Sequence, residues 1–83
     1  MLDPSLLENL DCSWPDDLRA YATKLRAMEV APEDETTRRS LAEYATIKAS
    51  AMELCASGNV LEAARLEGNC DAIYNRLPDY AKW

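Results

Sequence analysis

Apolar residues recur at steps of three and four along most of the chain, and no segment alternates with a period of two. The clearest series comprises Trp14, Leu18, Tyr21, Leu25 and Met28. This spacing predicts one apolar seam along a helix from about residue 14 to 30. Asp16 and Asp17 place negative charge at its start, where the helix dipole is positive. The helix is expected to stop before Pro32, because the residue preceding a proline disfavours helical backbone.

Two adjacent apolar rows predict a longer helix over about 34–57. One row comprises Tyr44, Ile47, Ala51 and Leu54, and the other comprises Leu41, Ala45, Met52 and Cys55. Two rows make a face wider than one neighbouring helix covers. We therefore expect this helix to be central, with neighbours on both sides and room for a second chain. Gly58 is well placed to close it with a left-handed residue.

A third main helix is predicted over about 60–77. Its seam comprises Ala63, Leu66, Cys70, Ile73 and Leu77. Asn59 and Glu62 have the spacing of a capping box, and Pro78 ends the pattern. A short N-terminal helix is expected over about 4–10. The predicted fold is therefore all-α, a single domain over 1–83 in which three main antiparallel helices form a small bundle beside the short N-terminal helix.

The turn between the last two helices has a recognisable pattern. Within 51–63, a small residue, Gly58 and the Glu-Ala pair at 62–63 follow one another, and this segment resembles the turn region of a tetratricopeptide-type helical hairpin. The family's later alanine position falls on Cys70 and its closing proline on Asn75, and there is no second copy of the motif. The resemblance implies a helical hairpin and does not assign the chain to the family.

Composition narrows the chemistry. The 83 residues carry 9 Lys and Arg against 15 Asp and Glu, a net charge of −6, so no global positive field exists to hold phosphates and direct nucleic-acid binding is not expected. The chain has no histidine and only 2 glycines, which removes the commonest general base and any phosphate-cradling loop. No apolar run is long enough for a membrane span, and the N-terminus lacks a signal-peptide pattern. We expect a cytoplasmic protein that needs no cofactor.

The remaining reactive side chains have plain structural interpretations. Cys12, Cys55 and Cys70 form no metal-binding pair and are expected to pack as small hydrophobic residues. The antiparallel register puts Cys55 and Cys70 about 12 Å apart, too far for a disulfide. The acidic run 33–35 and the pair 16–17 are interpreted as solvated helix starts, so no metal site is expected.

Aromatic residues near the C-terminus are the candidate partner-binding side chains: Tyr74, Tyr80 and Trp83. The sequence favours a non-enzymatic protein-interaction module that associates with itself as a homo-oligomer, most simply a homodimer, or with another protein. The alternative is a small regulatory or accessory protein acting on nucleic acid or on a nucleic-acid-binding partner, to which the basic residues Arg38 and Arg39 could contribute. A carboxylate-based metal or catalytic site is the third hypothesis.

Overall fold

The computed structural model describes residues 15–79, and within them the chain is helical, with no strand. The elements are α2 (Pro15–Ala27), the short 3-10 helix η1 (Pro32–Asp34), α3 (Glu35–Ala56) and α4 (Val60–Arg76). The predicted all-α class with three main helices is confirmed. The predicted helix over 4–10 lies outside the described residues.

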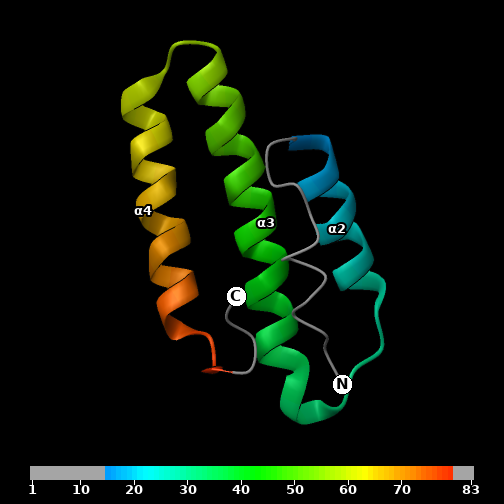
Figure 1. Ribbon diagram of the computed structural model, residues 1–83. Coiled ribbons are helices and arrows are strands. Elements are labelled where there is room, and N and C mark those ends of the chain that lie inside the picture. Colours follow the sequence, from blue (N-terminus) through cyan, green and yellow to red (C-terminus); the bar gives the residue numbers. More distant parts are fainter. Residues whose placement is uncertain (1–14, 80–83) are drawn as a thin grey trace.

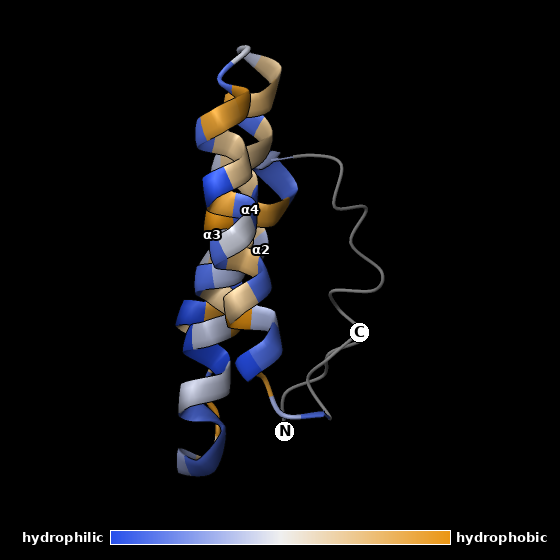
Figure 2. Ribbon diagram, turned by 90° about the vertical axis from the view of Figure 1, so that its left-hand side faces the viewer, coloured by the Kyte–Doolittle hydropathy of each residue, from blue (hydrophilic) through white to orange (hydrophobic). Residues whose placement is uncertain are grey.

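The three long helices lie side by side in one layer, and each runs antiparallel to the next (Figure 1). α3 is in the middle and packs along both α2 and α4, as its broad apolar face predicts. After a turn of 90° the three helices overlap, as expected when a single layer is viewed edge-on (Figure 2). α4 therefore has one face toward α3 and an opposite face at the edge of the layer.

The core lies mainly between α2 and α3. From α2 it takes the predicted seam residues Leu18, Tyr21 and Leu25, with Ala22 beside them. From α3 it takes Leu41, Ala42, Ala45 and Ala49, and Leu77 joins it from the segment after α4. Most of the buried α3 residues are alanines, which let α2 approach closely. Trp14, the first residue of the predicted seam, is outside the described residues.

Two predicted helix ranges agree with the structure to within one residue at each end, because α3 spans Glu35–Ala56 and α4 spans Val60–Arg76. The range predicted as 14–30 is wrong at its C-terminal end, since α2 stops at Ala27. The Met28 amide donates to Leu25 O (3.2 Å), and Arg38 of α3 donates Nη1 to Leu25 O (3.0 Å) and Arg26 O (2.9 Å). A guanidinium thus satisfies carbonyls that would otherwise continue the helix.

None of the helices within residues 15–79 has the length and apolar character required to cross a membrane.

Candidate functional site

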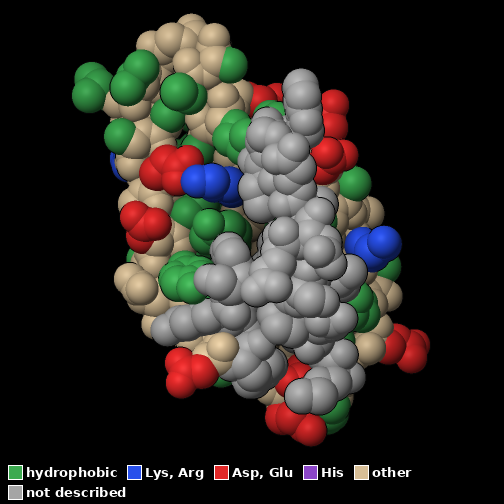
Figure 3. Space-filling view, in the orientation of Figure 1, with side chains coloured by type: hydrophobic (Ala, Val, Ile, Leu, Met, Phe, Trp, Pro, Cys, Tyr) green, Lys and Arg blue, Asp and Glu red, His purple; other side chains and the backbone are tan. Residues whose placement is uncertain are grey.

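The end of the α3–α4 hairpin, which we call the hairpin tip (Met52–Glu62), is the least buried part of the described chain. None of its eleven residues is buried, although Ala51 and Ala63 on either side are. Val60 keeps 62% and Leu61 90% of its surface exposed, and these two are the exposed large hydrophobic residues of the described chain. Hydrophobic side chains gather at this end in the space-filling view, over the α3–α4 turn (Figure 3).

Backbone geometry fixes this turn. Gly58 has φ 90°, and it has the only positive φ among residues 15–79. The Gly58 amide donates to Cys55 O (3.1 Å) and the Asn59 amide to Leu54 O (2.9 Å). These are the two bonds of a Schellman motif, so the predicted closure of the helix by Gly58 is confirmed.

α4 starts directly after this motif, which decides where its first side chains point. Asn59 is the N-cap, and its carbonyl accepts from the Ala63 amide (3.0 Å). The capping box predicted at Asn59 is wrong, because the Asn59 side chain makes no capping hydrogen bond. Since Ala63 begins the face that packs on α3, Leu61 lies on the opposite side of the helix and turns outward.

α2 reaches only the start of the hairpin tip, where Met52 packs against the α2–α3 core. The first turn of α2 lies beside the last turns of α3, and both α3 and α4 continue beyond it (Figure 1). At this boundary Arg19 of α2 forms an ion pair with Glu53 of α3, which raises the pKa of Arg19 mainly through their hydrogen bond. The tip is therefore a two-helix projection from a three-helix layer.

The prediction that all three cysteines pack as buried hydrophobic residues is wrong for Cys55, which is exposed at the tip. It is confirmed for Cys70, which is buried, and neither forms a disulfide. Cys12 lies outside the described residues. The difference follows from the layer, because α2 covers α3 only up to the start of the tip.

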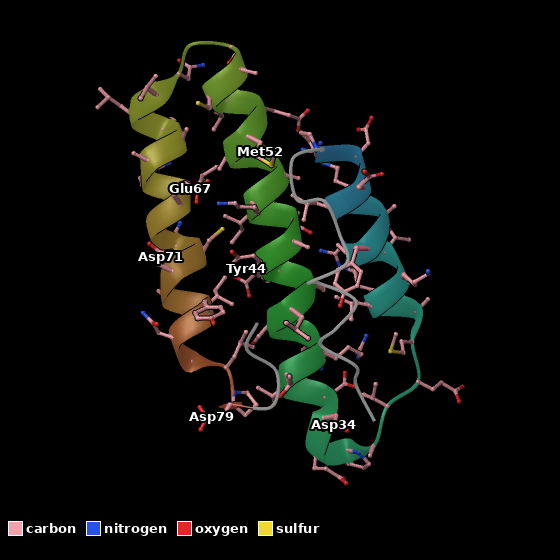
Figure 4. The ribbon with its side chains drawn as sticks, viewed as in Figure 1. Asp34, Tyr44, Met52, Glu67, Asp71 and Asp79 are labelled. Carbon is pink, nitrogen blue, oxygen red and sulfur yellow. The ribbon has the colours of Figure 1, made fainter. Side chains whose placement is uncertain are left out.

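A polar cluster bridges α3 and α4 below the tip, where Tyr44 and Glu67 lie between the two helices (Figure 4). Lys48 Nζ is 2.6 Å from Glu67 Oε2, and Cys70 Sγ donates weakly to Tyr44 O at 3.8 Å. Burial opposes the charge on Lys48, but the hydrogen bond to Glu67 and the attraction of nearby negative groups, Glu67 first, together outweigh it and raise the pKa of the ammonium. Burial raises the pKa of the Cys70 thiol to about 11. Such a thiol stays protonated at neutral pH and is a poor nucleophile.

Of the predicted partner-binding residues, Tyr74 is half-buried and packs against the α2–α3 core. Tyr80 and Trp83 lie outside the described residues, so the structure does not bring the three together. Their role stays a prediction.

The acidic runs are placed at helix starts. Asp16 and Asp17 lie in the first turn of α2, and Asp34 is buried before α3. Glu35 binds Arg38 and lies 3.4 Å from Arg39, and the hydrogen bond from Arg38 is the main reason that its pKa is lowered. Across residues 15–79, no three His, Cys, Asp or Glu side chains come close enough together to hold a metal ion.

A shallow depression of about 190 Å³ lies on α2, lined by Asp17, Ala20, Tyr21 and Lys24. Sites for small molecules are usually about 300–1,000 Å³ and enclose most of the ligand. This depression is too small and too open to define a binding pocket.

Two features escaped the sequence interpretation. Arg38 binds the end of α2, whereas the sequence suggests a basic residue available to a partner. The one local sign of an internal role is its i,i+3 spacing from Glu35. The exposed apolar surface is on the first turn of α4 and not along α3. That surface could have been found, because Val60 and Leu61 follow the turn residues and fall off the Ala63 seam.

The fold and the site together define a small all-α protein whose exposed apolar side chains sit at the end of a helical hairpin. No protein-family model matches this chain, and no curated protein or solved structure matches it either. The resemblance to a tetratricopeptide-type hairpin therefore remains a similarity of one turn.

Proposed function

We propose that this protein is a non-enzymatic interaction module that binds an apolar site on a protein chain, a further copy of itself included, through its hairpin tip. The observation that carries the proposal is the 90% exposure of Leu61 beside Val60 at 62%. Burying a leucine or valine side chain contributes about 1.5–3 kcal/mol. Two such residues next to each other supply the core of a small binding surface.

The tip is suited to binding because it is already ordered. The Schellman bonds at Gly58 and Asn59 hold the turn, and Val60 and Leu61 stand on the first turn of a 17-residue helix. Association then costs little conformational entropy beyond that of the two side chains. Oppositely charged side chains rim the tip, with Arg65 Nη2 2.7 Å from Glu62 Oε2. A mixed rim around an apolar centre is the usual anatomy of a protein interface.

A non-enzymatic role is supported by how the titratable groups are used. Lys48 is paired with Glu67 across the α3–α4 interface, Arg38 holds Glu35 and the end of α2, and the Cys70 thiol is protonated at neutral pH. These contacts serve the fold, and they converge on no cavity. Arg38 is engaged inside the chain and is not available as a basic contact for nucleic acid, so an accessory role with nucleic acid has less support. Cytoplasmic location stays a prediction.

Site-specific photo-crosslinking in the host cell tests the proposal. A benzoylphenylalanine at position 61 is expected to form a covalent adduct with a protein chain, because that side chain would sit inside the interface. The matched control carries the same group in place of Thr23, an exposed residue of α2. Equal adducts from both positions, or none from position 61 in a variant with native far-ultraviolet circular dichroism, would contradict the proposal.

A further inference from the structure

The face of α4 turned away from α3 is open along its length. Ala63, Cys70 and Ile73 are buried, so the centre of the opposite face falls on Leu61, Gly68 and Ala72, all exposed. A Cβ added at Gly68 would meet no atom within 4 Å. This outer face starts at the hairpin tip and continues down the edge of the layer (Figure 1).

We propose that a second copy of this chain occupies the outer face of α4, with the two α4 helices antiparallel around a two-fold axis near Gly68. The inference rests on the proposed function and names the partner and the surface. It is carried by the exposed apolar end of the face together with the distribution of charge along it.

The exposed charges of α4 balance, whereas the whole chain carries −6. The exposed charged residues on α4 are Glu62, Arg65, Asp71 and Arg76, which sum to zero. Two copies can therefore meet here without the like-charge repulsion that the net charge imposes on association elsewhere.

The order of these charges fits an antiparallel pair. Glu62 and Arg76 lie 14 residues apart, close to four turns, so they share one flank of the helix. An antiparallel two-fold brings this flank against itself. Glu62 is six residues before Gly68 and Arg76 is eight after it, which puts each Glu62 within about one turn of Arg76 of the second copy. The two-fold axis makes this pair twice.

The apolar groups also find partners in this arrangement. Leu61 lies seven residues before the axis, which places it level with Asn75 of the second copy, between Ala72 and Arg76. Ala72 leaves room for its side chain, and the methylene groups of Arg76 cover it. At Gly68 the two backbones can approach at the short end of the usual range of about 8–10 Å.

The size of the face sets the expected strength. A contact about 25 Å long and one helix wide is smaller than the roughly 800 Å² per partner of a standard interface. We therefore expect a reversible dimer with a dissociation constant of about 0.1–1 mM, or −4 to −5.5 kcal/mol.

Sedimentation equilibrium of the whole chain, with reductant to keep Cys55 as a thiol, tests this over about 10 µM to 1 mM. Wild type is expected to dimerise within this range. Gly68→Arg puts a long charged side chain at the centre of the face, where an added Cβ meets no atom within 4 Å, so the variant should keep its helicity and weaken association at least tenfold. Thr23→Arg adds the same charge on α2 and should leave association unchanged. A dimer that is equally strong in Gly68→Arg would overturn the proposal.

Charge reversal tests the antiparallel register. Glu62→Arg and Arg76→Glu should each weaken the dimer several-fold, since each places like charges opposite one another. The double variant should recover association to within about threefold of wild type. Weakening without recovery in the double variant, while both single variants remain folded, would refute the antiparallel pairing.

The outcomes separate this inference from the proposed function. A wild type that stays monomeric at 1 mM rules out the second copy as the occupant. If position 61 still crosslinks to a different protein, the interaction module stands with another partner. If it crosslinks to nothing, both proposals fall.

Discussion

The two ends of α3 are built in opposite ways. At its start, which we call the base, Leu41 packs with Leu25 and Leu77 in the core and Arg38 clamps the end of α2. At its other end, in the hairpin tip, no residue is buried and Leu61 is almost fully exposed. One continuous 22-residue helix thus runs from the buried core to the turn that carries the exposed side chains of Val60 and Leu61.

The difference shows how a short chain can keep a binding surface. The layer has one helix on either side of α3 at the base, but beyond the Arg19–Glu53 ion pair only α4 lies beside it, so core and exposed apolar surface are separated along one helix axis. Substitutions at the base should act on stability, and substitutions at the tip should act on association.

The largest effect is expected from Leu25→Ala. Leu25 is 0% exposed, and truncating a buried leucine costs about 2–5 kcal/mol. Leu61→Ala removes the same atoms at the tip and should change the free energy of unfolding by less than about 0.5 kcal/mol. Urea unfolding at low micromolar protein measures both. Similar losses for the two variants would contradict the division between base and tip.

The next largest effect on stability is expected from Arg38→Met. The substitution keeps much of the aliphatic stem but removes the donors to Leu25 O and Arg26 O and to the Glu35 carboxylate. Arg39→Met is the matched control, because Arg39 is exposed and lies 3.4 Å from the same Glu35. We expect a lower Tm and faster amide exchange at the C-terminal turn of α2 for Arg38→Met only. Equal Tm values for the two variants would show that the clamp contributes nothing.

The two glycines should respond with opposite signs. Gly58→Ala forces a side chain into φ 90°, which costs about 1–2 kcal/mol. Gly68→Ala adds a methyl group where nothing lies within 4 Å and gains up to about 1 kcal/mol of helix propensity. Thermal unfolding of the two variants tests this. A stabilising Gly58→Ala would refute the left-handed closure of α3.

A pH-dependent effect on stability is expected from Cys70. The pKa of its buried thiol is raised from 9.0 to about 11. Between those pH values the unfolded chain loses the proton while the folded chain keeps it, so the free energy of unfolding falls as pH rises. Wild type should therefore lose more stability than Cys70→Ala from pH 9 to 11. Identical pH slopes would contradict the burial of this thiol.

Thiol labelling compares the same two regions directly. In a Cys12→Ser background at pH 8, Cys55 at the tip should react quickly with a disulfide reagent, whereas Cys70 should react only on unfolding. Fast modification of both thiols in the native state would show that α3 does not cover Cys70.

Local patterns in the sequence were enough to predict the helices. The steps of three and four placed Leu18, Tyr21 and Leu25 in the core, the double row made α3 central, and Gly58 ended it. The end of α2 was missed because Arg38 acts from 12 residues away on the Arg26 carbonyl, and no pattern within α2 encodes that contact.

The candidate site was harder to predict. Whether an apolar residue is buried depends on how far the neighbouring helices extend. That α2 stops short of Cys55 is decided by tertiary packing, which no local pattern encodes. The sequence nonetheless shows that Leu61 lies off the apolar seam of its helix. The aromatic residues instead suggested a binding surface near the C-terminus, where Tyr74 packs on the core.

The central claim is that the fold does not use the apolar side chains of Val60 and Leu61. The most direct test is the free energy of unfolding of the double variant Val60→Gln/Leu61→Gln, measured by urea unfolding at low micromolar concentration, where association is negligible. We predict a value within about 1 kcal/mol of wild type, as expected for two exposed substitutions. A loss of more than about 2 kcal/mol would show that Val60 and Leu61 belong to the core and would contradict the account.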